Sequence, residues 1–482
     1  MSDADSQRRI VLVGGGYVSV LAYRSIVRRL RRRVRSGEVS IAVVCPVTCH
    51  QFHGWSAEVF QGIIAPEHHL TSLRELMPLA TFIPGRVVAV DAVARQLTVE
   101  LNQSLGPAVL GYDYLLLGTG SSEDDASIPG LRENGLRLKQ TDGMSTLRGQ
   151  LQNVVELAGS VREPKLRDEL LSIVFAGGGY MGVELCAAVA ELLQVWRRAH
   201  SVLRDQPPKI HLVHGSAQLL SNLRPELKGL GAYAQRELAR YGVEVILNTR
   251  VRAVREHEVE LDSGRAIRAR TIVSTIGQRC HVIAGTETFA RARDGRLVAD
   301  STLRVHGHER VWAAGDAAYV EHPRAAGPCP AIAFWAIRHG QLAGHNIARA
   351  ILGEPLRPLK VFPLGEAASL GVGKGIAELN GIFVVGRLAW LNRILFFLYF
   401  MPSWRQAFRV LVDWLLFALL GRRGGFMERP AAQLAASPGP VLGAPALLGP
   451  ARAVRSLASA PSVTTSVAAT SVAATSAVAE GR

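Results

Sequence analysis

The sequence predicts an α/β fold with two copies of a strand, glycine turn and helix unit, one near the N-terminus and one near the middle. Residues 10–20 and 172–185 each carry an apolar, β-rich run that meets closely spaced glycines and then becomes helical. The 482 residues are 48% hydrophobic and include 47 glycines, which fits two or three packed domains with many turns and excludes a disordered chain.

The first unit is expected to run from strand to turn, helix and strand. The strands are expected at residues 10–13 and 39–44 and the helix at residues 20–35. Gly14 and Gly16, with Gly15 between them, permit a tight turn and the close approach of a pyrophosphate to the helix N-terminus, where free N–H groups favour anions. Ser19 takes the third position of the fingerprint and is small enough for close helix packing.

The second unit repeats this plan. A strand is expected from residue 173 and another at residues 210–213, and Gly177, Gly179 and Gly182 stand at G-x-G-x-x-G spacing. A single glycine-rich turn is weak evidence, because such turns are common in structural loops. Two of them, each between a strand and a helix, predict two bound dinucleotides in Rossmann-like units.

Much of the formal charge of +15 lies in two parts of the chain, residues 28–35 and residues 387–423. The first is expected to be the solvated face of a helix. It has no interleaved aromatic residues, so no nucleic-acid partner is expected. The second lies among apolar residues, so a membrane surface is the partner expected there.

The cysteines and the N-terminal sequence favour a reducing, cytosolic setting. The five cysteines are an odd number and are widely spread, which argues against a disulfide framework. No N-terminal apolar segment has the pattern of a signal peptide. No metal site is expected.

Three further segments complete a family resemblance: residues 112–121 (YDYLLLGTGS), 273–278 (VSTIGQ) and 311–320 (VWAAGDAAYV). Together with the glycine turns, their order resembles that of the two-dinucleotide-domain flavoproteins, in which FAD occupies the first unit and NAD(P)H the second. Phosphate, ribitol and hinge motifs in this order are much harder to obtain by chance than any one of them. The resemblance implies a FAD-binding domain with an inserted NAD(P)H-binding domain.

The resemblance also implies roles for particular residues. Asp316, which follows Gly315, would hold the ribitol of FAD, while the next helix N-terminus would face the phosphates. Thr119 and Gly120 would lie where the chain crosses between the domains. Gly277 would lie at the strand end that closes the nucleotide domain.

The C-terminal third narrows the resemblance. Residues 364–379 and 386–421 resemble the end of type II NADH:quinone oxidoreductases, which are single-chain, non-pumping respiratory enzymes that sit on the membrane without spanning it. This implies a peripheral enzyme on the cytoplasmic side of the cell membrane that passes a hydride from NAD(P)H to FAD and two electrons on to a quinone. The expected boundaries are 1–145 and 296–380 for the FAD domain, 146–295 for the NAD(P)H domain, 381–426 for membrane-associating helices and 427–482 for a disordered tail.

The apolar stretch at residues 387–421 predicts two interfacial helices split at Pro402, because polar interruptions leave no window of roughly 20 apolar residues for a spanning helix. On the second helix Arg405 and Arg409 would meet headgroups beside a lipid-facing stripe. The stripe is Trp404, Phe408, Leu411, Leu415 and Leu419. A core helix pair and the seam of a homodimer are the alternatives. Five further aromatics favour the membrane by widening the apolar surface: Phe396, Phe397, Phe400, Trp414 and Phe417.

The sequence departs from the family pattern at four positions. Cys45 stands where the second strand of an FAD unit usually ends in an acidic residue, and His214 stands where a glutamate would hold the NAD ribose. Each change removes a charge-assisted hydrogen bond of about 1.5 to 3 kcal/mol but keeps the phosphate turn, so the preference for NADH over NADPH is left open. Phe334 and His339 replace two glutamines that flank the quinone channel in the family.

Five residues are expected to carry or support the chemistry. Glu184 matches a family glutamate near the nicotinamide and flavin, and Lys374 matches a lysine-bearing segment beside the quinone site. Phe334 and Trp335 would stack on a quinone ring, and His339 would donate a proton. The simpler alternatives are a glutamate favoured by the helix dipole, a solvated loop lysine, core aromatics and a histidine that caps local backbone.

Two other functions stay open. A relative that kept the fold and lost turnover would be a nucleotide-binding or membrane-docked interaction protein, which the four departures favour. A sulfide:quinone oxidoreductase shares the fold, with Cys280 and Cys329 as candidate flavin-side thiols, although its three-cysteine constellation is not recognisable. Cys45 and Cys49 are separated by three residues at a strand end, so we expect structural thiols rather than the redox pair of a disulfide reductase.

Overall fold

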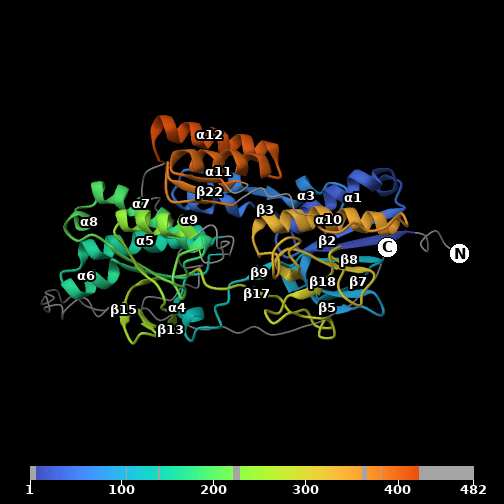
Figure 1. The fold of residues 1–482 in the computed structure, drawn as a ribbon, viewed down its shortest axis with the longest axis horizontal. Helices are drawn as coiled ribbons and strands as arrows, with labels where there is room; N and C mark the ends of the chain where they lie inside the picture. Colours follow the sequence, from blue (N-terminus) through green and yellow to red (C-terminus); the bar gives the residue numbers. More distant parts are fainter. Residues whose placement is uncertain are drawn as a thin grey trace, which may run out of the picture. The chain divides into compact units, whose positions relative to one another are not determined.

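The computed structural model divides the chain into two compact units, Met1–Leu434 and Ala435–Arg482. It describes residues 7–104, 106–138, 142–220, 228–360, 366–379 and 382–422. The predicted tail at residues 427–482 therefore lies outside the described residues. All elements named below belong to the first unit (Figure 1).

A seven-stranded sheet carries the first glycine turn. Its strands are β1 (Arg8–Val13), β2 (Val39–Cys45), β5 (Thr81–Asp91), β6 (Gln96–Leu101), β7 (Pro107–Gly111), β8 (Tyr114–Leu117) and β19 (Val311–Ala313). In the order β19-β8-β1-β2-β5-β6-β7, the pairs from β19 to β5 are parallel and the last two are antiparallel. The central strands β1 and β8 are apolar and buried, as parallel strands covered on both faces require.

Helices α1 (Tyr17–Arg35) and α10 (Ala333–Ile351) pack against each other on this sheet. A side chain at Gly340 or Gly344 of α10 would overlap with the backbone of α1, so glycine permits the close approach. The predicted strands at 10–13 and 39–44 are confirmed, and the predicted helix begins earlier, directly after the turn.

Smaller elements surround the first sheet. They are β3 (Cys49–Gln51), η2 (His53–Trp55), α2 (Ser56–Phe60), η3 (Pro66–His69), β4 (Leu70–Ser72), α3 (Leu73–Leu76), η4 (Asn102–Ser104), β9 (Ser121–Ser122), β17 (Arg279–Cys280), β18 (Leu297–Ala299), η6 (Gly315–Ala317) and β20 (Ala318–Val320). The 3-10 turn η6 follows β19 and carries the predicted ribitol aspartate.

A second, four-stranded parallel sheet carries the second glycine turn. Its order is β12-β11-β10-β16, and its strands are β10 (Ser172–Ala176), β11 (Lys209–Val213), β12 (Val243–Ile246) and β16 (Thr271–Ser274). The helices of this region are α4 (Leu131–Asn134), α5 (Gly143–Ser160), α6 (Pro164–Leu170), α7 (Tyr180–Ala199), α8 (Ser201–Asp205) and α9 (Lys228–Arg240). A three-stranded antiparallel sheet of β13 (Val251–Arg255), β14 (Glu258–Leu261) and β15 (Ala266–Arg268) completes it.

The C-terminal part of the described chain forms a small sheet and two helices. The antiparallel strands are β21 (Glu366–Ser369), β22 (Gly375–Leu379) and β23 (Ile382–Val385), followed by α11 (Arg387–Phe400) and α12 (Trp404–Leu420). The predicted helix break at Pro402 is confirmed. No helix within the described ranges is both long and apolar enough to cross a membrane.

The two C-terminal helices have one face in the core and one face exposed. The predicted stripe is the exposed face, with Trp404 76%, Phe408 60% and Leu419 81% exposed. The expectation that further aromatics widen this surface is wrong for Trp414 and Phe397, which turn inward. Their ring centroids lie 6.4 Å and 5.3 Å from that of the fully buried Trp55, because the apolar residues of each helix are divided between lining the core and facing outward.

Candidate functional site

The two glycine turns have the same local geometry at the carboxyl ends of β1 and β10. Gly14 has φ +105° and Gly177 has φ +112°, a backbone region that favours glycine. A side chain on Gly14 would overlap with the carbonyl of Gly118, and one on Gly177 would lie 2.7 Å from the carbonyl oxygen of Thr275. The residues that follow β8 and β16 therefore pack closely against the two turns.

The last glycine in each run of three, Gly16 in the first turn and Gly179 in the second, faces open space. A Cβ atom at Gly16 or Gly179 would meet no atom within 4 Å. These two residues are the N-caps of α1 and α7, and neither helix start has a side-chain cap. The first N–H groups of both helices are therefore available to an anion, so both turns fit a pyrophosphate.

The third fingerprint positions hold the helices against their turns. A side chain at Gly182 would overlap with the carbonyl of Gly177, so α7 requires glycine there. Ser19 is fully buried, and its hydroxyl lacks a hydrogen-bond partner among the described residues. The predicted packing role of Ser19 agrees with this burial.

Cys45 and His214 occupy equivalent places at the ends of β2 and β11. A Cβ atom on Gly15 would lie 2.8 Å from Cys45 Sγ, and one on Gly178 would lie 2.9 Å from His214 Cγ. Gly178 N donates a 3.1 Å hydrogen bond to His214 Nδ1. Burial raises the pKa of the Cys45 thiol and lowers the pKa of His214. Neither strand end therefore supplies the negative charge that the family pattern places there.

Asp316 lies where the first turn meets the segment after β8. Ser121 Oγ donates a 2.8 Å hydrogen bond to Asp316 Oδ2. Val18, in the first turn of α1, is the nearest neighbour that a side chain at either Gly118 or Gly315 would meet, at 2.7 Å in both cases. The structure thus brings the first glycine turn, the crossing segment with Thr119 and Gly120, and the aspartate motif together.

Gly277 lies beyond the end of β16, in the segment that leads out of the second sheet. Its φ is +57°, and a Cβ atom there would lie 3.0 Å from the side chain of Asp124. The two strands that connect the sheets pair as β17 with β9. The predicted position of Gly277 at the close of the nucleotide domain agrees with this arrangement.

His339 lies beneath the aspartate motif. It is 1% exposed, and its Nδ1 accepts a 3.2 Å hydrogen bond from Gly315 N. Burial, with the nearby charge of Arg296, lowers its pKa to about 4. The contact supports the backbone-capping alternative, and proton donation to a quinone stays a prediction.

Phe334 and Trp335 begin helix α10. Trp335 is 6% exposed, and its ring centroid lies 5.8 Å from that of His339. Phe334 is half-buried under the guanidinium of Arg338, 5.6 Å from its ring centroid. The two rings are inclined at 75°, so they do not present one common stacking face, and quinone stacking stays a prediction.

Glu184 belongs to a buried ion cluster that sequence reasoning missed. Arg393 of α11 has no exposed side-chain surface; its Nη1 lies 2.6 Å from Glu58 Oε1 and its Nε lies 3.1 Å from Glu184 Oε1. Glu184 Oε1 also accepts a 2.7 Å hydrogen bond from Ser369 N. Burial raises the pKa of Glu184, against the opposing charge of Arg393. The cluster joins three segments: α2, α7 and α11.

Lys374 is not the solvated loop lysine of the simpler alternative. Its Nζ lies 3.3 Å from Glu237 Oε2 and 4.2 Å from the ring centroid of Tyr241. Glu237 is 2% exposed and belongs to α9. Lys374 therefore ties the loop before β22 to the second sheet's helices, and its role beside a quinone stays a prediction.

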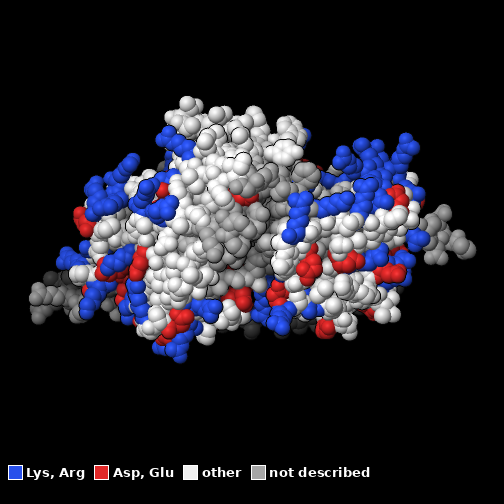
Figure 2. All heavy atoms as spheres, in the orientation of Figure 1, with Lys and Arg blue, Asp and Glu red and all other residues white. Residues whose placement is uncertain are grey.

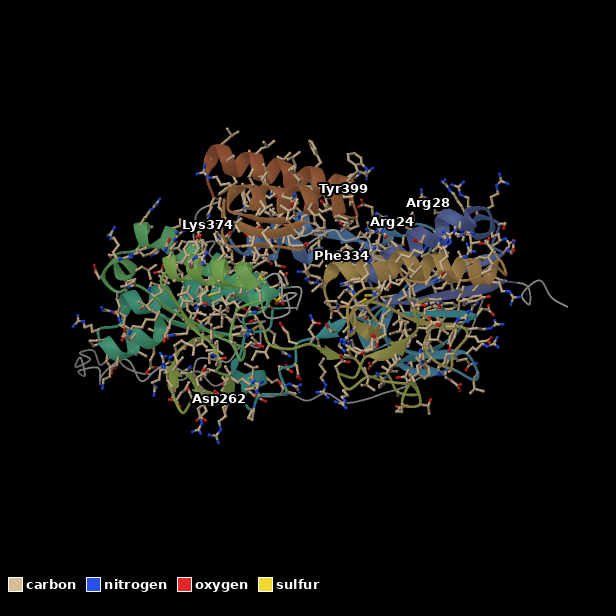
Figure 3. The ribbon with its side chains drawn as sticks, in the orientation of Figure 1. Arg24, Arg28, Asp262, Phe334, Lys374 and Tyr399 are labelled. Carbon is tan, nitrogen blue, oxygen red and sulfur yellow. The ribbon has the colours of Figure 1, made fainter. Side chains whose placement is uncertain are left out.

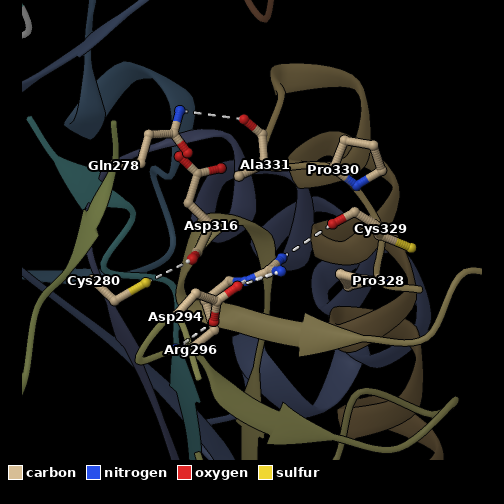
Figure 4. Close-up of a pocket in the computed structure, with 9 residues that line it drawn as sticks. All are labelled: Gln278, Cys280, Asp294, Arg296, Asp316, Pro328, Cys329, Pro330 and Ala331. Carbon is tan, nitrogen blue, oxygen red and sulfur yellow. Dashed lines mark hydrogen bonds and ion pairs between the residues drawn. The ribbon is translucent and has the colours of Figure 1, made fainter. Parts of the chain in front are cut away.

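All five cysteines are free thiols. Cys280 and Cys329 line a hollow of about 190 Å³ beside Asp316, shown in Figure 4. Cys280 Sγ donates to the backbone oxygen of Asp316 at 3.3 Å, whereas Arg296 holds the carbonyl of Cys329 at 3.1 Å. Burial raises the pKa of both thiols, that of Cys329 to about 12. The raised pKa values of these two thiols disfavour the thiolate form that the sulfide-oxidising alternative would need.

Comparison with known proteins gives the same fold and related chemistry. The family model described as "Pyridine nucleotide-disulphide oxidoreductase" matches residues 9–340. The type II NADH:quinone oxidoreductase NdhA of Mycobacterium tuberculosis is 25% identical over 88% of this chain and 90% of the relative. The demethylphylloquinone reductase NdbB of Synechocystis is 26% identical over 69% of this chain and 77% of the relative.

A solved structure shares the arrangement of elements. The structure of NDH2 from Plasmodium falciparum in complex with NADH has a TM-score of 0.76 at 13% identity, and the match covers 86% of this chain and 99% of that one. At this identity the likeness concerns the fold alone. The predicted α/β fold with two Rossmann-like units is confirmed.

Proposed function

The chain belongs to the pyridine nucleotide-disulphide oxidoreductase family, and we propose that it is a FAD-dependent NAD(P)H:quinone oxidoreductase of the type II kind. The observation that carries the proposal is the pair of uncapped helix N-termini at Gly16 and Gly179, each facing open space. Two such sites suit two dinucleotides. FAD, when bound, supplies a hydride acceptor and a two-electron donor.

Particular residues would hold and orient these groups. The N–H groups at the start of α1 would bind the pyrophosphate of FAD, while Asp316, fixed by Ser121, would accept hydrogen bonds from the ribitol. The start of α7 would bind NAD(P)H in the same way. Because His214 brings no carboxylate, nothing at that strand end rejects a 2′-phosphate, so NADH and NADPH both remain candidate donors.

We also propose that α11 and α12 dock the protein peripherally on the cytoplasmic face of the membrane. The exposed stripe on α12 supports this, because an apolar face of this extent is unusual on a soluble monomer. Figure 2 shows the surface over these helices as largely free of charge. A homodimer seam is the competing occupant, and it would make the protein dimeric without lipid.

The visible spectrum of the purified protein tests the cofactor assignment. Bound oxidised flavin absorbs near roughly 370 and 450 nm, and the expected result is a yellow protein that loses its 450 nm band with NADH and regains it with a quinone. A yellow protein without this cycle would support the non-catalytic alternative, which the uncharged strand ends at Cys45 and His214 favour. A colourless protein that takes up no added FAD would contradict the proposal.

A further inference from the structure

A basic hollow of about 810 Å³ is lined largely by residues of helices α1 and α10. It is bounded by α1, by α10 and by residues 357–360. The basic side chains that line it are Arg24, Arg28, Arg29, Arg338, His345, Arg357 and Lys360. No carboxylate is found among its described lining residues. The redox reaction proposed above assigns no role to these basic side chains.

The walls of the hollow are fixed by the fold. Asn346, fully buried in α10, accepts a 2.9 Å hydrogen bond from Arg357 N and donates a 2.8 Å hydrogen bond to Arg357 O. Leu359 N donates to Ser301 O at 2.7 Å. The segment that carries Arg357 and Lys360 is therefore held in place, so the cations are not merely scattered on a mobile surface.

The positive charge of the hollow is poorly compensated. Glu354 at its edge is shared by Arg29 and Arg349, at 2.7 Å and 2.9 Å. Within the described ranges, Arg28, Arg357 and Lys360 form no ion pair. Arg338 Nε and His345 Nε2 are buried and have no hydrogen-bond partner among the described residues. Burial, with the charges of Arg29 and Arg357, lowers the pKa of His345, as expected where cations crowd together.

The hollow adjoins the exposed apolar helices. Arg24 donates a hydrogen bond to the carbonyl of Pro402, at the break between α11 and α12. Arg338 lies near Tyr399, which is 83% exposed at the end of α11. Figure 3 shows Arg24 and Arg28 on α1, near Tyr399, and Figure 2 shows Lys and Arg gathered beside the uncharged surface.

We propose that this hollow binds the headgroup phosphate of an anionic phospholipid when the apolar stripe rests on a bilayer. Arginine side chains recognise phosphate with paired, charge-assisted hydrogen bonds, and a surface rich in anionic lipid attracts nearby basic groups. The proposal rests on the membrane docking proposed above. It adds a lipid-class preference that the apolar stripe alone would not give.

The test compares two charge reversals on the full chain. Arg28→Glu/Lys360→Glu changes two exposed residues that line the hollow, whereas Arg31→Glu/Arg32→Glu makes the same charge change on exposed residues of α1 outside it. Binding is measured by flotation with phosphatidylcholine vesicles, with and without phosphatidylglycerol. The hollow variant should lose the preference for anionic vesicles by about tenfold or more, and the control by less than about threefold.

The remaining outcomes separate the possible failures. If both variants lose the preference for anionic vesicles equally, the proposal is overturned, because the preference would then come from surface charge in general and not from the hollow. The proposal would also be overturned if millimolar inorganic phosphate or glycerol phosphate competed for the hollow as strongly as anionic vesicles do. A soluble phosphate would then be the ligand. If no vesicle binds even the wild type, the membrane docking itself fails. Flavin content and reduction of a soluble quinone should be unchanged in both variants, and they report separately on the redox proposal.

Discussion

His339 is a buried histidine that the fold keeps neutral. Its Nδ1 accepts the hydrogen bond of Gly315 N, so the ring supports the turn that carries Asp316. Its pKa is lowered to about 4, below the ordinary value of about 6.5. In the unfolded chain the ring takes up a proton below about pH 6.5, whereas in the folded chain it resists until about pH 4.

His339→Gln should make the protein less sensitive to acid. The stability linked to His339 is complete above pH 6.5 and is lost as the pH falls towards 4, by about 3 kcal/mol in total. Glutamine keeps an acceptor for Gly315 N but does not titrate. Urea unfolding from pH 7.5 to 4.5 measures the effect, with the exposed His306→Gln as the control. Superimposable pH profiles for His339→Gln and wild type would contradict the assigned burial.

His214 is the residue that we propose to face the ribose at the second nucleotide site. His214→Glu should raise the ratio of kcat/KM for NADH to that for NADPH by about tenfold or more, because a carboxylate binds ribose hydroxyls and repels a 2′-phosphate. His214→Gln is the matched control, since it keeps a hydrogen-bonding side chain without the charge. An unchanged ratio in His214→Glu would show that this strand end does not meet the ribose.

At the scale of elements, α11 and α12 are each anchored by a buried charge. Arg393 binds Glu58 and Glu184, while Asp413 Oδ2 accepts hydrogen bonds from Ala65 N at 3.1 Å and from His68 Nδ1 at 2.6 Å. Both side chains are almost completely buried. Two of the charges that interrupt the apolar stretch, Arg393 and Asp413, therefore hold the inner faces of the helices in place.

Arg393→Met should destabilise the protein by about 3 to 5 kcal/mol, because it leaves the buried carboxylate of Glu58 and the partly buried carboxylate of Glu184 without their partner. The exposed Arg387→Met on the same helix should have little effect. Urea unfolding followed by tryptophan fluorescence gives the comparison. Adding Glu58→Gln and Glu184→Gln to Arg393→Met should recover much of the loss, and no recovery would point to lost packing rather than unpaired charge.

Phe408→Glu/Leu415→Glu should weaken vesicle binding by about tenfold or more, because both residues belong to the exposed stripe. Reduction of long-tailed quinones should fall more than reduction of small soluble ones. Deleting both helices is a poorer test, since it would uncover Phe52 and Trp55. Val109→Glu/Val282→Glu places the same charges on exposed valines elsewhere. If the wild type is a dimer, and Phe408→Glu/Leu415→Glu dissociates it without changing lipid binding, the exposed stripe would be a homodimer interface instead.

Local patterns predicted the elements well, whereas contacts between distant residues were not predictable. The glycine turns can be predicted because their backbone conformation requires glycine at closely spaced positions. Pro402 predicts a break because proline in a helix interior removes a backbone hydrogen bond. Glu58 and Arg393 are 335 residues apart, and Arg393 alone suggested only a break in an apolar run. The helical spacing of apolar residues also does not tell which aromatic residues face outward and which face the core. For this reason Trp414 was wrongly expected on the exposed surface.

In the whole molecule, the first sheet is built from two parts of the sequence, one before and one after the segment that forms the second sheet. β8 pairs with β19 in the first sheet, although the whole second sheet lies between them in the sequence. Each sheet then presents one open glycine turn. We propose that these turns bind different dinucleotides: the first turn binds the flavin and the second binds the electron donor.

Anaerobic bleaching of the flavin by NADH, followed by addition of a quinone, tests this claim most directly. Wild type should lose and then regain its band near roughly 450 nm. Gly179→Ala should fold, since its Cβ atom meets nothing in the protein, and should keep the yellow colour while resisting bleaching by NADH. Gly16→Ala should instead lose the flavin. A Gly179→Ala variant that bleaches as fast as wild type, or a wild type that NADH does not reduce, would contradict the account.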